Sequence, residues 1–343
     1  MNQNHLLEVN DLKITFHTDG GAVEAVDGVS FYVDNGETLG IVGESGCGKS
    51  VTSMSILRLI ETPPGAYEGG QIMFDGMDML TIPDADLRKI RGNDIAFIFQ
   101  EPMTSLNPVI KIGNQISETM ILHRNMTPKA ARAEAIKLLE RVRIPNPERI
   151  ADSYPFSLSG GMRQRVMIAI ALACEPRLLI ADEPTTALDI TIQAQVLDLM
   201  NELKKEIDAA IIFITHDLGV IAEMSDRVMV MYAGKVVELA SVEKIYTEPE
   251  HPYTMGLISS KPDMATTGDR LKVIPGNVPD LIRKPSGCPF HPRCERVSER
   301  CAAEFPPVSR VSEGHLVFCW DYINSGYDRH RAAIAGKNAE VKP

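Results

Sequence analysis

Hydrophobic residues occur along the chain as short apolar runs that alternate with amphipathic stretches. Apolar runs rich in β-branched residues predict strands at 6–16, 29–33, 38–42, 71–74, 95–99, 177–182, 210–215 and 227–232. Helical spacing predicts helices that begin at Lys49, Pro128, Gly160 and Ile192. Strands that alternate with helices through the middle of a chain are typical of α/β architecture.

The stretch between the predicted strands 95–99 and 177–182 has a helical pattern. Thr127 and Pro128 form a typical helix start, because threonine caps free backbone N–H groups and proline suits the first turn. Ala135, Leu139 and Val142 then fall on one apolar face. We therefore expect residues 101–160 to form a mostly helical insertion.

The sequence changes character after Tyr246, where proline and other helix breakers become frequent and remain so to residue 307. We predict a boundary near 245–265, with a first domain over residues 1–250 and a smaller second domain over 251–325. Residues 326–343 are expected to form a flexible tail.

Composition and charge exclude several classes of protein. The chain has 343 residues and a net charge of −11, which argues against nucleic acid as the main partner because phosphate binding needs a basic patch. The N-terminus lacks the basic and apolar segments of a secretory signal. The longest apolar run, Val166 to Cys174, is far shorter than the ~20 residues of a membrane-spanning helix. We therefore expect a soluble cytoplasmic protein without stable disulfides.

The segment GESGCGKS matches the phosphate-loop pattern G-x-x-x-x-G-K-[ST]. It follows the predicted strand 38–42 and precedes a predicted helix, where backbone N–H groups and a helix N-terminus bind phosphate. A chance glycine-rich turn would not explain both neighbours. Lys49 is expected to bind the outer phosphates of ATP and Ser50 to bind Mg²⁺. The residues expected to contact nucleotide are Gly43, Ser45, Gly46, Cys47, Gly48, Lys49, Ser50 and Val51.

The segment RLLIADEP, residues 177–184, ends an apolar strand with two carboxylates. Asp182 is suited to hold Mg²⁺ through water. Glu183 should lie on the opposite side of the strand by alternation, where it could polarise an attacking water. An acidic pair can also merely end a strand, but the complete phosphate loop in the same chain favours the functional interpretation.

Further motifs stand in order along the chain. LSGGMRQR covers residues 158–165, Gln100 ends the strand 95–99, TALD covers 186–189, and His216 follows the strand 210–215. Together with the phosphate loop, these motifs resemble those of ABC-type ATPases over residues 6–245. The resemblance implies a P-loop nucleotide-binding domain with a RecA-like core, a β subdomain and a helical insertion.

The same resemblance implies how ATP is bound. Two such domains pack head to tail, so that ATP lies between the phosphate loop of one chain and Ser159, Gly160 and Gly161 of the other. These three residues open a predicted helix, whose N–H groups suit a γ-phosphate. Met162 stands where many relatives carry glutamine, and the helix start should survive that change. Phe16 is the candidate for stacking on adenine.

The resemblance also assigns the chemistry of hydrolysis. Glu183, His216 and Gln100 are the expected catalytic residues, and His216 should contact both the γ-phosphate and Glu183. Mg²⁺ is expected to be held through Ser50, Gln100 and Asp182.

Several longer stretches of the sequence narrow the resemblance to one group of ABC-type ATPases. FQEPMTSLNP (99–108), HPYT (251–254) and IPGNVPDL with GCPFHPRC (274–294) resemble the ATPases of oligopeptide and dipeptide importers. IADEPTTALDITIQAQ and the C-terminal cysteines resemble the D-type subunit of dipeptide permeases most closely. This implies a peripheral subunit at the cytoplasmic face of the cell membrane. Its partners would be two permease subunits, a second and distinct ATPase chain, and an extracytoplasmic peptide-binding protein. Nickel and other small-substrate importers share this ATPase type.

Other ABC ATPases fit the sequence less well. Those that act in DNA repair insert coiled coils or zinc modules before the signature, and no sustained heptads occur here. Translation-associated ATPases carry two cassettes on one chain, whereas this chain has one. A generic P-loop kinase lacks the signature.

The remaining chemistry lies in four cysteines, Cys288, Cys294, Cys301 and Cys319, spaced C-x5-C-x6-C-x17-C. Zinc usually takes more closely spaced cysteine pairs, whereas four thiolates suit an iron–sulfur cluster. The importer resemblance implies a [4Fe-4S] cluster, with zinc or free thiols as alternatives, and we expect a structural role before a redox one. His291 is expected to pack or to donate a hydrogen bond rather than to ligate.

Two more cysteines lie outside this set. Cys47 is beside a helix N-terminus that could lower its pKa, although a small residue at a variable loop position is the simpler interpretation. Cys174 ends an apolar helical face and is expected to fill buried space.

Overall fold

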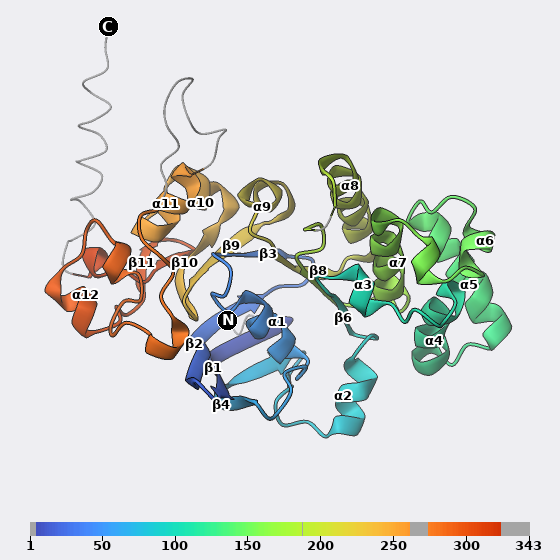
Figure 1. The fold of residues 1–343 in the computed structure, drawn as a ribbon, viewed down its shortest axis with the longest axis horizontal. Helices are drawn as coiled ribbons and strands as arrows, with labels where there is room; N and C mark the ends of the chain where they lie inside the picture. The colour runs from blue at the N-terminus through green and yellow to red at the C-terminus, as the bar shows by residue number, and fades with distance from the viewer. Residues whose placement is uncertain (1–4, 187, 261–273, 324–343) are drawn as a thin grey trace, which may run out of the picture.

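The computed structural model describes residues 5–186, 188–260 and 274–323 (Figure 1). Within them the strands form two sheets, one in the order β2-β1-β4-β5 and one in the order β11-β12-β10-β9-β3-β8-β7-β6. The strands are β1 Leu7–Thr18, β2 Gly21–Val33, β3 Thr38–Val42, β4 Gly65–Phe74, β5 Met77–Asp78, β6 Ile95–Ile98, β7 Leu178–Asp182, β8 Ala210–Ile214, β9 Arg227–Tyr232, β10 Lys235–Ser241, β11 Ser309–Ser312 and β12 His315–Val317.

Helices connect these strands. The α-helices are α1 Lys49–Ile56, α2 Asp84–Ile90, α3 Pro102–Ser105, α4 Ile112–Arg124, α5 Pro128–Arg141, α6 Pro147–Ala151, α7 Gly160–Leu172, α8 Ile190–Ile207, α9 Leu218–Met224, α10 Val242–Thr247, α11 Pro252–Ser259 and α12 Glu299–Ala303. Short 3₁₀ turns are η1 Pro155–Ser157, η3 Leu281–Arg283, η4 His291–Arg293 and η5 Trp320–Tyr322.

The larger sheet has a parallel centre, in which β9, β3, β8, β7 and β6 pair in that order. Every residue of β3, β7 and β8 is buried. Parallel strands are covered on both faces, which is why these strands are apolar almost throughout rather than alternating with polar residues. The α/β fold expected from the sequence is thus confirmed.

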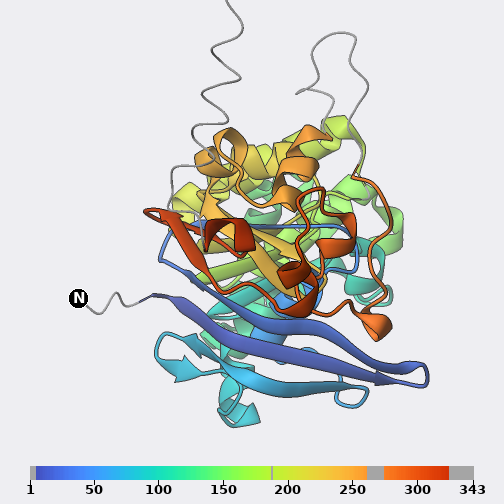
Figure 2. The ribbon, with the colours of Figure 1, turned by 90° about the vertical axis from the view of Figure 1, so that its left-hand side faces the viewer.

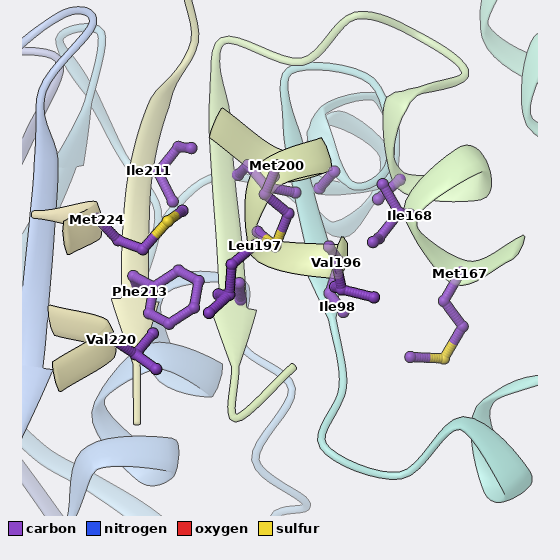
Figure 3. Close-up of a cluster of buried hydrophobic side chains, with 14 of the residues drawn as sticks. Ile98, Met167, Ile168, Val196, Leu197, Met200, Ile211, Phe213, Val220 and Met224 are labelled. Carbon is purple, nitrogen blue, oxygen red and sulfur yellow. The ribbon is translucent and has the colours of Figure 1, made fainter. Parts of the chain in front are cut away.

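Side chains of these strands alternate between two hydrophobic layers. On β8, Ile211 and Phe213 face a layer covered by helices, whereas Ile212 and Ile214 join the layer formed with the antiparallel sheet and α1. Figure 3 shows part of the helix-covered layer, where α7, α8 and α9 pack against β6 and β8. The labelled side chains there are Ile98, Met167, Ile168, Val196, Leu197, Met200, Ile211, Phe213, Val220 and Met224.

The antiparallel sheet lies along one side of the molecule, with long strands β1 and β2 (Figure 2). Strand β1 pairs with β2 on one edge and with β4 on the other. At the far end of the molecule from the C-terminal elements, α4, α5 and α6 gather on the side of β6 (Figure 1). Between β6 and β7 the chain forms helices α3 to α7, within which the predicted apolar face of Ala135, Leu139 and Val142 is fully buried.

The C-terminal segment, defined here as residues 251–260 and 274–323, extends the main sheet rather than standing beside it. Strand β12 pairs antiparallel with β10, opposing Val317 to Glu238, and β11 pairs with β12. Cys288 and Phe290 belong to the same hydrophobic cluster as Phe213 of β8. The segment therefore shares both a sheet and a core with the preceding chain. The division into 1–250 and 251–325 stays a prediction, and the expected tail 326–343 lies outside the described residues.

The predicted strands are all present, and helices begin at Lys49, Pro128 and Gly160 as expected. Helix α8 begins at Ile190 rather than Ile192, because Asp189 caps it by accepting a hydrogen bond from the Ile192 N–H at 3.0 Å. The strands β5, β10, β11 and β12 were not expected from the sequence. In the part of the chain that the structure describes, no helix combines the length and apolarity needed to cross a membrane.

Candidate functional site

The phosphate loop joins β3 to α1 in a path that requires glycine. A Cβ on Gly43 would lie 2.2 Å from the Met231 carbonyl oxygen, and one on Gly48, where φ is 101°, would lie 2.3 Å from that of Ala25. Neither space admits a side chain. Ser45 and Gly46 are exposed at the tip of the loop, Ser50 is half-buried, and Val51 packs against the core.

Lys49 is the first residue of α1 and is buried within the loop. Its Nζ donates to the carbonyl oxygens of Gly43 at 2.8 Å and Glu44 at 3.2 Å. The positive charge therefore lies inside the curve of the loop, beside the free N–H groups of a helix start. This is the place where a phosphate would be bound.

The pKa of Cys47 differs from the one suggested by the sequence. Its side chain is 1% exposed, and burial raises the pKa of the thiol, although the nearby Lys49 charge opposes part of that rise. The suggested lowering by the helix N-terminus is wrong, because desolvation of a buried thiolate outweighs it. Cys174 is also buried, as expected, and its Sγ lies 3.7 Å from the Thr119 carbonyl oxygen.

Asp182 ends β7 next to Ser50. Burial raises the pKa of Asp182, and a hydrogen bond from the Ser50 hydroxyl opposes that rise. Its Oδ1 atom is buried and finds no hydrogen-bond donor among the described residues. A buried carboxylate oxygen without a donor beside a hydroxyl is a donor set that Mg²⁺ prefers. These two residues therefore fit the expected metal.

Glu183 is the point on which the expected catalytic side chains converge. Its Oε2 accepts hydrogen bonds from Gln100 Nε2 at 3.2 Å and Thr186 Oγ1 at 2.7 Å, and lies 3.4 Å from His216 Nδ1. The three partners come from the ends of β6 and β8 and from the turn after β7. Thr186 was not singled out from the sequence, although it begins the TALD motif. Ala187 of that motif lies outside the described residues.

The side chain of Glu183 is oriented by a turn and not, as expected from the sequence, by strand alternation. Strand β7 ends at Asp182, and Glu183 adopts φ 46°, the left-handed region that a residue with a side chain rarely occupies. Strand alternation therefore does not direct its side chain. The turn aims the carboxylate at Gln100 and His216, and strained backbone of this kind is concentrated at functional sites.

Ser159 caps α7, with its Oγ accepting a hydrogen bond from the Met162 N–H at 3.4 Å. The helix start expected despite Met162 is therefore present. Gly161 is required because a Cβ there would lie 2.6 Å from Ile192 of α8. Ser159, Gly160 and Gly161 line a surface groove of about 690 Å³ to which the phosphate loop contributes no residue. The two halves of an ATP site thus lie apart within one chain.

Phe16 lies near the end of β1, opposite Val23 of β2 and Gly65 of β4. It is half-buried and packs against the hydrophobic layer that contains α1. One part of the ring therefore remains accessible for stacking, whereas Phe31 is buried in the core as expected.

Cys288, Cys294, Cys301 and Cys319 line one narrow, mostly apolar cavity, together with His251, Phe290, His291 and Trp320. Burial raises the pKa of Cys288 to about 11 and that of Cys319 to about 12, so these thiols stay protonated unless a cation stabilises the thiolates. His291 Nδ1 lies 2.9 Å from the Cys288 carbonyl oxygen, in line with a hydrogen-bonding role.

The arrangement of these thiols does not by itself support a bound metal. Among the described residues, no group of three or more His, Cys, Asp or Glu side chains is arranged to hold a metal ion. Zinc would need all four sulfurs within about 2.3 Å of one point. The four thiols line one cavity, and the iron–sulfur and zinc assignments both stay predictions.

Comparison with known proteins identifies the family. Residues 26–186 match the ABC transporter family, and residues 237–301 match the oligopeptide/dipeptide transporter C-terminal region. The chain is 52% identical to the oligopeptide transport ATP-binding protein OppD of Bacillus subtilis, over 92% of this chain and 88% of that protein. The chain belongs to the ATP-binding subunits of oligopeptide and dipeptide ABC transporters.

Other members of this family match as fully. The dipeptide transport ATP-binding protein DppD of Bacillus subtilis is 49% identical, and OppD of Salmonella typhimurium is 48% identical, each over 92% of this chain and 94% of the relative. The ATP-binding cassette MJ0796, solved as a dimer in a post-hydrolysis state with ADP and Pi, is 27% identical with a TM-score of 0.62, over 69% of this chain and 98% of its own. The chain is thus an ABC-type ATPase in fold and family.

Proposed function

We propose that this chain is the ATP-hydrolysing motor subunit of a membrane-bound importer of dipeptides or oligopeptides. The main support for the proposal is that two features occur in one chain. Gln100 and His216 contact Glu183 in a chain that has a phosphate loop, and the same chain matches the peptide-transporter C-terminal region. In domain terms, residues 1–250 form the nucleotide-binding domain and residues 251–325 the family-specific domain.

The residues divide the chemistry of ATP cleavage among them. Lys49 and the start of α1 bind the phosphates, and Phe16 stacks on the adenine. Ser50 and Asp182, with Gln100, hold Mg²⁺, which supplies positive charge next to the phosphates when bound. Glu183 accepts a hydrogen bond from the attacking water and so raises its nucleophilicity. His216 orients Glu183 and contacts the γ-phosphate.

A second ATPase chain completes the site. Ser159, Gly160 and Gly161 lie away from this chain's own phosphate loop, so their N–H groups are free to meet the γ-phosphate bound by a partner packed head to tail. By family relationship that partner is a distinct ATPase subunit. ATP binding then closes the pair and drives two permease subunits, with an extracytoplasmic binding protein that selects the peptide.

The proposed location is the cytoplasmic face of the membrane, where the exposed surface near Gln100 and the helices α3 to α6 would contact the permease. Phe99, Val109 and Leu122 are large apolar side chains exposed in that region. An importer of nickel or another small substrate is the second candidate, since such systems use the same type of ATPase.

Reconstitution tests the proposed function. The chain, assembled with the second ATPase and the permeases in vesicles, is expected to hydrolyse ATP faster when binding protein loaded with a dipeptide or tripeptide is added. Stimulation by nickel-loaded binding protein and none by peptide would favour the second candidate. Hydrolysis unaffected by either ligand would overturn an importer role.

We further propose that Cys288, Cys294, Cys301 and Cys319 hold a [4Fe-4S] cluster, which ties the segments carrying them together. Anaerobically purified chain should contain about four iron atoms and absorb visible light. Cys294→Ser should lose the iron, whereas Cys174→Ser, a change at a buried thiol elsewhere, should keep it. Zinc in place of iron would support the alternative, and metal-free colourless protein would refute both.

A further inference from the structure

Arg293, in the C-terminal segment, forms an ion pair with the phosphate loop. Its Nη1 donates to Glu44 Oε2 at 2.7 Å and its Nη2 to Glu44 Oε1 at 3.2 Å. Both carboxylate oxygens are therefore engaged, in the two-point geometry that only arginine offers. The Arg293 side chain is 6% exposed and that of Glu44 is 25% exposed, so the pair is largely shielded from water.

The guanidinium of Arg293 is itself fixed on its other edges. Its Nε donates to the Pro275 carbonyl oxygen at 2.9 Å, and its Nη1 also donates to the Tyr232 hydroxyl at 3.1 Å. Burial opposes the charge, but the hydrogen bonds to Glu44 and Tyr232 raise the pKa of Arg293. A side chain held at each edge does not swing away when Glu44 moves, and therefore restrains it.

The backbone around Arg293 is a tight turn between two of the cavity cysteines. The His291 N–H donates to the Cys288 carbonyl oxygen, and the Arg293 N–H to that of Phe290, each at 2.9 Å. The Phe290 ring packs against Tyr232 and Tyr253 at centroid distances of 5.2 and 5.4 Å. The position of Arg293 thus follows from the packing of the C-terminal segment.

Glu44 is the second residue of the phosphate loop, and each of its polar groups is held. Its N–H donates to the Tyr253 hydroxyl at 2.9 Å, its carbonyl accepts from Lys49, and its carboxylate accepts from Arg293. The carbonyl also accepts a hydrogen bond from the Cys47 N–H at 3.2 Å, within the loop itself. Arg293 and Tyr253, both from the C-terminal segment, hold Glu44 from outside the loop.

We propose that Arg293 is a positioning residue for nucleotide binding, acting through Glu44 to hold the phosphate loop open for the phosphates. The proposal rests on the proposed nucleotide site and adds that a family-specific segment sets its affinity. Because the loop binds substrate and transition state alike, losing the pair should raise the KM for ATP and leave kcat nearly unchanged.

The test is a double-mutant cycle on the full-length chain, with the Kd of a fluorescent ADP derivative as the readout. Arg293→Ala and Glu44→Ala should each weaken binding by about tenfold, as expected for one charge-assisted pair. The double variant should bind no more weakly than either single variant, because both changes remove the same interaction. Arg293→Lys should recover part of the affinity.

Arg177→Ala is the matched control. It removes another two-point arginine pair, to Asp75 at 2.6 and 3.3 Å, and should leave the Kd unchanged. In the assembled transporter, a loss of kcat at constant KM in Arg293→Ala would indicate a merely structural role and overturn the proposal. So would unchanged affinity in Arg293→Ala, or additive losses in the double variant. Wild-type chain that binds no nucleotide would instead refute the proposed nucleotide site.

Discussion

The parallel centre of the main sheet and the C-terminal segment differ in how far polar contacts add to the packing that holds them in place. Strands β3, β7 and β8 are buried along their whole length and pair in register, so hydrophobic burial and backbone hydrogen bonds fix the loops at their ends. The C-terminal segment contains short helices, short strands and 3₁₀ turns. It joins the main sheet through β12 and packs Tyr253, Cys288 and Phe290 into the core, and it adds polar contacts between residues far apart in the chain.

Three such contacts connect the segment to different parts of the core. His315 donates to the buried Glu238 of β10, Lys284 pairs with Asp27 of β2, and Arg293 pairs with the phosphate loop. Buried polar pairs are costly to break, because the remaining partner loses its hydrogen bond away from water. The difference teaches that apolar packing dominates in the parallel centre, whereas the added segment combines apolar packing with a few specific polar side chains.

The largest expected effect concerns Glu183, the catalytic residue that follows strand β7. Glu183→Gln keeps the size of the side chain but removes the charge that polarises water, so kcat of the assembled transporter should fall by about 10²–10⁴-fold. ATP binding should be retained, because Lys49 and the loop are untouched. Glu175→Gln, at an exposed carboxylate paired with Arg124, should hydrolyse ATP normally. Turnover close to wild type in Glu183→Gln would refute the role of Glu183.

The next prediction concerns Glu238, a buried carboxylate of β10 that contacts the C-terminal segment. Glu238 is fully buried and accepts hydrogen bonds from the Glu250 N–H, the His251 N–H and His315 Nε2 at 2.7–2.9 Å. Glu238→Leu leaves these donors unpaired and should lower the free energy of unfolding by about 3–5 kcal/mol. Urea unfolding measures the loss. Glu243→Leu, at an exposed position on α10, should change it little.

The same urea unfolding can follow the C-terminal segment separately from the whole chain, because Trp320 is the one tryptophan of the chain and lies in that segment. Its fluorescence reports unfolding of the segment, whereas far-UV circular dichroism reports the whole chain. We expect both midpoints to shift together in Glu238→Leu, since β12 belongs to the main sheet. Fluorescence that changes well before the dichroism would show that the segment unfolds separately.

The smallest expected effect concerns Asp27, which lies 2.7 Å from Lys284 and 2.9 Å from Lys235. Burial raises the pKa of this carboxyl, but the hydrogen bonds and charges of the two lysines outweigh burial and lower it below 3.8. A lowered pKa stabilises the folded chain above pH 3.8, and that contribution is lost as the pH falls through the folded value.

Asp27→Asn should therefore lower the free energy of unfolding by about 1 kcal/mol at pH 7, since the pair is partly exposed. The difference from wild type should shrink as the pH is lowered towards 3. Asp86→Asn, at an exposed pair with Lys89, is the control and should change the free energy of unfolding at pH 7 little. An equal loss at pH 7 and at pH 3.5 would contradict the ion-pair origin of the effect.

The sequence by itself determined the elements that local pattern encodes. Apolar runs located the parallel strands, and the fixed spacing of the phosphate loop located Lys49 and Ser50 at a helix start, because strand and helix periods and turn-forming glycines are properties of neighbouring residues. The four cysteines that line one cavity were also apparent as a set, although their spacing alone did not show that they converge.

The tertiary structure decided how distant residues meet. The direction of Glu183 depends on a left-handed turn, and its partners come from separate strands. Strand β10 was missed because Glu238 interrupts its apolar run. A buried carboxylate at this position is explained only by its hydrogen bonds with His251 and His315, which come from later parts of the chain. Lys284 and Asp27 are 257 positions apart, and no local pattern connects residues at that separation. Packing, rather than periodicity, placed the C-terminal segment against the phosphate loop.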